Sequence, residues 1–387
     1  MIKRDKYLND LINRMHNGMI KVVTGIRRCG KSYLIFTIFK NYLLEQGIDE
    51  KRAREIYDEK YSIAKQNFTE EALRIANERV KELEDRLIPK IETVNDGLKA
   101  FADPSFQMLL VDAQKAAAAT ERSVDYDLLS ELLVHRIEKG NDRHTRTGIH
   151  RAVEIVEDIS NEALLGLTVV HSLNSFIPVS SECASALDIL DSLYGRIIYD
   201  KLPVGNDWIE DLDILDAIRI NHFGKFKSIN EYYASALNGI VTIGVKKDSD
   251  DYNTAIKILQ DNGLMIPNLF IENSLLQDYM RINIGNFEAI DSLMLVRVIG
   301  GTPMQAPLSE QQKTAIKSII ELYVKDSKLK NDVEESFVSE WDKRNNLALL
   351  RRWLEKIPNS FSITSVGKVL AHANAQRCDN KLPPLNE

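Results

Sequence analysis

The sequence predicts a mainly α-helical, multi-helical protein with one short N-terminal β-strand–loop–helix unit and room for a few short strands in its C-terminal half. Apolar residues recur at helical spacing through most of the chain, from residues 5–15 to residues 309–325. Apolar residues make up 44% and charged residues 28% of the chain, as in ordinary globular proteins. One β-branched run, Ile20–Val23, precedes a glycine-containing loop and gives the clearest strand signal.

Composition and charge indicate where the protein is located and which ligands suit it. No window approaches 18 consecutive apolar residues, and the charged first residues precede no apolar stretch, so we expect a cytoplasmic protein without a membrane span or signal peptide. Residues 1–47 carry nine Lys/Arg against three Asp/Glu, whereas the whole chain has a formal net charge of −7. The basic N-terminal part suits a nucleotide, and the acidic remainder makes nucleic-acid binding unexpected.

The first 47 residues predict a helix, a strand, a loop and a second helix. Apolar spacing indicates a leader helix over residues 5–15, which ends before Asn17-Gly18. The strand at Ile20–Val23 and the loop follow, and the apolar-rich segment 31–45 predicts a helix that Gly47 stops.

Gly25 to Ser32 fit the phosphate-binding loop pattern G-x-x-x-x-G-K-[ST]. Gly25 and Gly30 allow the tight turn that directs backbone N–H groups at phosphate oxygens. Lys31 reaches the terminal phosphates, and Ser32 offers its hydroxyl to the accompanying magnesium ion. The sequence therefore predicts ATP and Mg²⁺ as ligands of this loop, with Ser32 as the metal contact.

The loop and the helix before it resemble the opening of the prokaryotic AAA-type ATPases. In that family a T-G-[IV]-R-R-x-G-K-[ST] loop follows a leader helix that contains Tyr-Leu, and this chain reads TGIRRCGKS over residues 24–32. The resemblance covers residues 1–48 and implies binding of ATP and magnesium. Arg27 and Arg28 belong to the resembled motif; they either clamp phosphates or solvate the outside of the loop.

The second half of such an ATPase site is missing from the sequence. A family member continues into a strand that ends in acidic residues, which hold magnesium and activate water. The best candidate, Met108–Asp112, instead predicts a helix, because Asp103-Pro104 is a strong helix start. Asp112 is also followed by Ala113 instead of a glutamate. We therefore predict no catalytic residues and at most a weak or incomplete ATPase.

Helical patterns continue through the remainder of the chain. Residues 49–88 predict a charged helix, with Thr69 as a helix N-cap and Pro89 just beyond the end. Capping boxes at residues 228–231 and 309–312 begin later helices.

The seven histidines give no metal-binding pattern. His144 and His150 are six residues apart, and no His-Glu-x-x-His occurs. His135 lies within a helical run, and His372 lies near residue 387. We expect all of these to be solvated or hydrogen-bonded structural histidines.

Residues 50–387 resemble a family of uncharacterised bacterial all-helical proteins, on stretches such as FTEEALRIANERVKEL and DLLSELLVHRIEKGNDR. This resemblance implies a helical module without an assigned activity. The predicted domains are a truncated loop element with its leader helix (1–48), a helical domain (49–200), a mixed, mostly helical region (201–300) and a C-terminal helical region (301–387).

Two functions are compatible with these features. The preferred one is ATP binding by the N-terminal loop, fused to a helical module, with hydrolysis expected only if an acid is supplied from elsewhere. The alternative is a non-enzymatic helical interaction protein with a relic loop, because a lone strand cannot make the parallel sheet that normally holds such a loop. The expected partners are a nucleotide and a protein that binds the helical part, without a membrane or nucleic acid.

Overall fold

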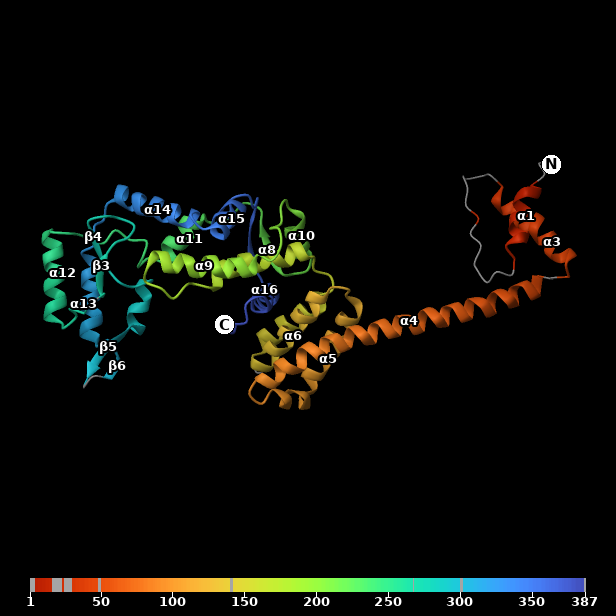
Figure 1. The fold of residues 1–387 in the computed structure, drawn as a ribbon, viewed down its shortest axis with the longest axis horizontal. Helices are drawn as coiled ribbons and strands as arrows, with labels where there is room; N and C mark the ends of the chain where they lie inside the picture. The colour runs from red at the N-terminus through yellow and green to blue at the C-terminus, as the bar shows by residue number, and fades with distance from the viewer. Residues whose placement is uncertain are drawn as a thin grey trace. The chain divides into compact units, whose positions relative to one another are not determined.

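The protein is mainly helical with a few short strands, as the sequence predicts (Figure 1). Contacts divide it into an N-terminal unit, residues 1–78, and a main unit, residues 79–387. None of the described helices combines the length and apolar character that a bilayer crossing requires. The structure, a computed structural model, describes residues 4–15, 23, 30–47, 50–139, 142–266, 268–299 and 302–385.

The N-terminal unit contains the two helical segments that the sequence predicts. Helix α1 spans Asp5–Asn13. A second helical run follows Gly30 and has three consecutive parts: α2 (Lys31–Tyr33), a π-helical stretch η1 (Leu34–Phe39) and α3 (Lys40–Glu45). The predicted strand lies mostly outside the described residues, and Val23, which is described, is in neither a helix nor a strand.

Helix α4 (Glu50–Thr93) is one continuous helix, which corrects two expectations. Thr69 does not cap a helix, because it lies in the interior and its hydroxyl donates to the Lys65 carbonyl at 2.9 Å. Pro89 lies inside the last turns of the helix, although proline removes a backbone hydrogen bond there. Leu87 and Ile91 are buried on either side of it, and we infer that their burial in the main core offsets that loss.

The larger part of the main unit is built from helices around an extensive apolar core. Asp103 caps α5 as the sequence predicts, because its carboxylate accepts a hydrogen bond from the Ser105 N–H at 2.9 Å. The predicted capping boxes begin α11 (Ile229–Ala236) and α13 (Glu310–Glu321). The helices of this core are α5 (Pro104–Ala119), α6 (Ser123–Glu138), α7 (Arg143–Ile155), α8 (Asn161–Ser175), α9 (Cys183–Ile197), α10 (Asp207–Ile214), α11 (Ile229–Ala236), α14 (Ser327–Asp342), α15 (Asn345–Leu354) and α16 (Ser365–Cys378), with a 3₁₀ turn at Gly97–Ala102 before them.

Helix α16 lies at the centre of this core and contacts α6, α7, α8 and α9. Small residues make the close packing possible. A Cβ atom on Gly367 would lie 2.0 Å from the Ala217 carbonyl oxygen, so only glycine fits at that position. Ala371, Ala373 and Ala375 are fully buried along the same helix.

Short antiparallel strands join segments that are far apart in the sequence. Strand β1 (Ile218–Asn221) pairs with β7 (Ser360–Ile363). A three-stranded sheet has the order β2 (Val245–Lys246), β4 (Tyr279–Ile282) and β3 (Phe270–Glu272), and β5 (Met294–Ile299) forms a hairpin with β6 (Thr302–Pro307). Helices α12 (Asp250–Asp261) and α13 (Glu310–Glu321) pack beside the three-stranded sheet around a second, smaller core (Figure 1).

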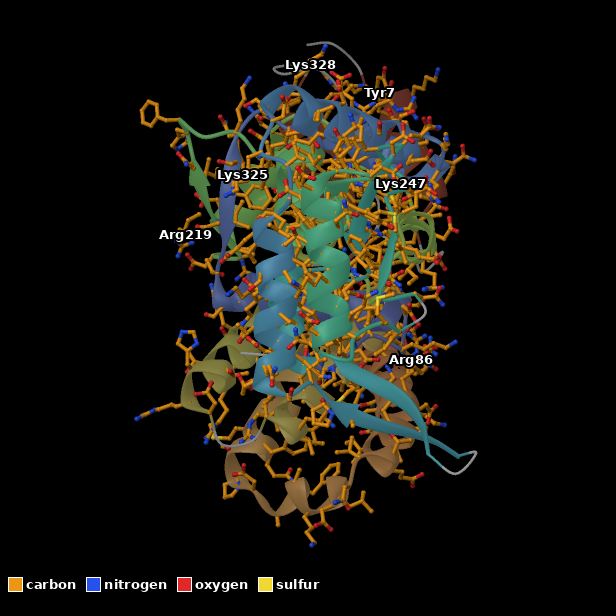
Figure 2. All side chains as sticks on the ribbon, turned by 90° about the vertical axis from the view of Figure 1, so that its left-hand side faces the viewer. Tyr7, Arg86, Arg219, Lys247, Lys325 and Lys328 are labelled. Carbon is orange, nitrogen blue, oxygen red and sulfur yellow. The ribbon has the colours of Figure 1, made fainter. Side chains whose placement is uncertain are left out.

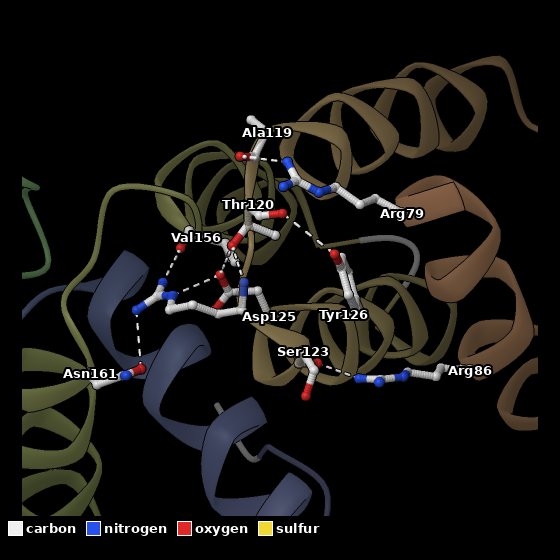
Figure 3. A network of polar contacts seen from close by, with 10 residues as sticks. Arg79, Arg86, Ala119, Thr120, Ser123, Asp125, Tyr126, Val156 and Asn161 are labelled. Atoms are coloured by element: carbon white, nitrogen blue, oxygen red, sulfur yellow. Dashed lines mark hydrogen bonds and ion pairs between the residues drawn. The ribbon is translucent and has the colours of Figure 1, made fainter. Parts of the chain in front are cut away.

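An ion pair between a partly exposed arginine and a buried aspartate fixes the connection between α5 and α6 (Figure 3). The Asp125 carboxylate is fully buried and accepts hydrogen bonds from the Thr120 hydroxyl and, at 2.9 Å, from Arg122 Nε. Arg122 also donates to the Val156 carbonyl at 2.9 Å and to Asn161 Oδ1 at 3.1 Å. One guanidinium therefore ties this connection to the end of α7 and the start of α8.

Candidate functional site

The described part of the predicted phosphate-binding loop begins at Gly30. Its φ of +80° is left-handed, a conformation that favours glycine, and the helical run starts at the next residue, Lys31. The Lys31 side chain is half-buried and Ser32 is exposed. Gly30, Lys31 and Ser32 thus stand at the start of a helix, in the order that the motif requires.

The other predicted loop residues, Gly25, Arg27 and Arg28, lie outside the described residues. A further cation lies close to Gly30 instead. A Cβ atom built on Gly30 would lie 2.5 Å from Arg4 Nη2 and 2.9 Å from Arg4 Cζ, so the guanidinium covers the glycine. Sequence reasoning missed Arg4, because nothing in the motif points to a residue 26 positions upstream.

Asp112, the residue weighed as a magnesium-binding acid, lies within α5, as the sequence predicts for Met108–Asp112. Its carboxylate pairs with Lys115 Nζ at 2.9 Å and lies 3.7 Å from His150 Nε2. In the described residues of the N-terminal unit there is no β-strand. The described residues of this unit therefore add no strand-borne acid to the loop.

A second site of interest is a cavity of about 500 Å³ in the main unit, beside α8 and α16. His171 Nε2 and His372 Nδ1 are 3.3 Å apart, and His372 Nε2 lies 3.0 Å from the Pro383 carbonyl oxygen. A carbonyl only accepts, so His372 donates through Nε2, its Nδ1 accepts, and His171 donates through Nε2. The Ser175 hydroxyl lies 3.3 Å from His171 Nδ1, the remaining acceptor.

Burial keeps both imidazoles neutral. It lowers the pKa of His171 to about 3, and the nearby His372 and Lys368 act in the same direction. It also lowers the pKa of His372 to about 4, with His135 contributing. The described residues contain no cluster of His, Cys, Asp or Glu that could hold a metal ion. His171 and His372 are thus hydrogen-bonded to each other and to their surroundings.

Comparison with known proteins concerns the helical part of the chain. Residues 47–383 match the model of a family whose description reads only ":-like". The chain belongs to this family. It is an uncharacterised family, in agreement with the predicted resemblance of residues 50–387, and its description names no activity, cofactor or partner.

The loop at residues 25–32 lies outside the part of the chain that the family model covers. A 48-residue stretch is 46% identical to an uncharacterised protein of Haemophilus influenzae, and the match spans 12% of each chain. No solved structure matches this chain. Neither match names a phosphate-binding loop, so the resemblance of residues 1–48 to the AAA-type ATPases stays a prediction.

Proposed function

We propose that the N-terminal unit binds ATP through its phosphates, with magnesium at the Ser32 hydroxyl. The observation that carries this proposal is the left-handed Gly30 directly before Lys31 and Ser32 at a helix start. Backbone N–H groups at a helix start and a lysine in the first turn favour a phosphate there. The Arg4 guanidinium against Gly30 adds a second positive charge at the same place.

The proposal is for binding and not for turnover. A P-loop ATPase needs an acid that holds magnesium and a group that positions the attacking water. The sequence does not place such an acid after a strand, and the described part of the N-terminal unit supplies none on a strand. We expect ATP to bind without hydrolysis above background.

Isothermal titration of the full chain with ATP and Mg²⁺ tests the proposal. Lys31→Met removes the charge with little change in length, and we expect at least about a tenfold weaker Kd. Lys65→Met is the matched control, because Lys65 is exposed on α4 of the same unit and outside the loop. No saturable binding, or equal affinity in wild type and Lys31→Met, would contradict the proposal.

A second candidate function, protein binding by the helical part, is favoured by one observation. Between residues 61 and 73, α4 exposes large apolar side chains: Phe68 is 76% exposed, and Tyr61 and Leu73 are each 58% exposed. Tyr61, Phe68 and Leu73 line one hollow on α4 and suit the apolar face of a partner helix, which a second copy of this chain would provide. Sedimentation of wild type and Phe68→Glu tests this. A wild type that stays monomeric at high concentration would exclude self-association through α4.

A further inference from the structure

A cavity of about 400 Å³ between α5, α6 and α7 of the main unit is lined by four arginines. It is separate from both sites described above and lies within the part of the chain that the family model covers. The other lining residues are few and mostly neutral. The cavity is lined by Ser105, Leu109, Arg136, Arg143, Arg146, Thr147, His150, Arg151 and Glu154.

Helix α7 brings most of these side chains to one face. Arg143, Arg146, His150 and Glu154 are separated by three or four positions, which places them on the same side of a helix. The opposite side of α7, which includes Ile149, is buried in the core. Because that apolar side fixes the rotation of the helix, the arginines point away from the core and towards the cavity.

One arginine is buried and held in place. The Arg136 side chain is 7% exposed, and its Nη2 donates to Asp103 Oδ2 and to Ser105 Oγ, both at 2.8 Å. The Ser105 hydroxyl also accepts a longer hydrogen bond from Arg146 Nη2, at 3.4 Å. Arg136 and Arg146 therefore converge on one hydroxyl at the wall of the cavity.

The positive charges of the cavity are incompletely neutralised by the protein. Among the described lining residues Glu154 is the sole carboxylate, and it pairs with Arg151 at 2.9 Å. Arg136 pairs with Asp103. Within the described ranges, Arg143 and Arg146 have no carboxylate within ion-pair distance. Two arginines thus remain without a counter-charge beside a third that is buried.

We propose that this cavity binds a small phosphorylated ligand through a phosphomonoester or diphosphate group. The planar guanidinium presents paired N–H donors that match phosphate oxygens, and two or three of them suit a multiply charged anion. Such an anion neutralises Arg143 and Arg146 and accepts the donors that the protein leaves unused. The chain as a whole has a net negative charge. An anion is therefore attracted to the cavity, where positive charge is in local excess, and not to the protein surface in general.

Size and surroundings favour a small ligand over nucleic acid. A volume of about 400 Å³ is within the usual range of small-molecule sites. The Asp112 carboxylate lies next to the rim residue His150 and, with Glu154, interrupts any longer basic surface along α7. An extended polyanion needs a continuous basic stripe, which these carboxylates break.

The test uses the full chain carrying Lys31→Met, so that the proposed loop site does not contribute. Titrations with pyrophosphate and with AMP distinguish an inorganic phosphate group from a phosphate carried by a nucleoside. We expect saturable binding of at least one of them. Arg143→Met and Arg146→Met should each weaken it at least about tenfold, because each removes one unpaired guanidinium.

Arg219→Met is the matched control, since Arg219 is exposed elsewhere in the main unit (Figure 2). Its guanidinium pairs with Asp216 at 2.7 Å. It should bind like the Lys31→Met parent. Arg143 is itself exposed, so its substitution tests the site even if the Arg146 variant folds poorly. No saturable binding of either ligand at about 10 mM, or unchanged affinity in the Arg143 variant, would overturn the proposal. Tighter binding of a short DNA duplex than of both small ligands would also overturn it.

Discussion

The buried pair His171 and His372 makes the stability of the main unit sensitive to mild acid. Both rings are almost fully buried, and their pKa values fall from the ordinary 6.5 to about 3 and about 4. In the unfolded chain each histidine takes up a proton as the pH falls through about 6.5, whereas the folded protein does not. The free energy of unfolding therefore falls with pH below about 6.5, until the folded-state pKa values are reached.

The size of this effect follows from the two pKa values. Proton linkage between pH 7 and pH 5 gives a loss of about 2 kcal/mol for each histidine, because the unfolded ring goes from mostly neutral to almost fully protonated while the folded ring stays neutral. Together the pair accounts for about 4 kcal/mol, as an upper figure, since each ring affects the other. That is a large part of the stability of an ordinary domain.

Urea unfolding of wild type and His372→Gln at pH 7 and at pH 5 measures this effect. The glutamine amide still donates to the Pro383 carbonyl but does not titrate, so the loss between the two pH values should shrink by about 2 kcal/mol. Burial raises the pKa of Asp125, which opposes the effect, but this contribution is common to both proteins and cancels in the comparison. His222→Gln, at an exposed histidine, is the control and should keep the full loss. Equal losses in wild type and His372→Gln would refute the reasoning.

Two further predictions concern the stability of the main unit, one through an ion pair and one through close packing at a glycine. Replacing Arg122 by methionine leaves the buried Asp125 carboxylate without the cation that pairs with it. We expect the free energy of unfolding, measured with urea, to fall by about 3 to 5 kcal/mol. A loss below about 1 kcal/mol would contradict this. Gly166→Ala places a Cβ atom 2.6 Å from the Trp208 ring and should lower stability by about 1 to 3 kcal/mol. Gly148→Ala, whose nearest neighbour lies at 3.3 Å, should be milder, and the reverse order would count against the packing argument.

The sequence predicted helix starts correctly where the interaction that sets them lies within a few residues. Asp103-Pro104 and the two capping boxes begin helices because a side chain satisfies N–H groups a few residues away. The continuity of α4 was not predictable in this way. Thr69 and Pro89 carry local cap and stop signals, but Leu87 and Ile91 are buried in a core formed by distant residues, which overrides the stop signal.

The two candidate sites likewise combine a pattern that is visible in the sequence with contacts that only the fold creates. The order Gly30, Lys31 and Ser32 is a local pattern of the sequence, and Gly30 is left-handed directly before the helix. Arg4, by contrast, reaches Gly30 only through the fold. The arginine cavity also needs three helices, because Arg136 on α6 and Arg146 on α7 both donate to Ser105 of α5. No spacing in the sequence connects those helices.

The central position of α16 has a consequence for synthesis on the ribosome. Asn374 donates to Thr168 Oγ1 at 2.8 Å across 206 positions, so α8 is made long before the helix that it packs against. Until α16 emerges, α6, α7 and α8 lack the element that buries their facing surfaces. Nascent chains in that state expose apolar surface and are prone to aggregate. We therefore expect folding yield to depend on chaperones that hold the incomplete chain until residues 365–378 are available.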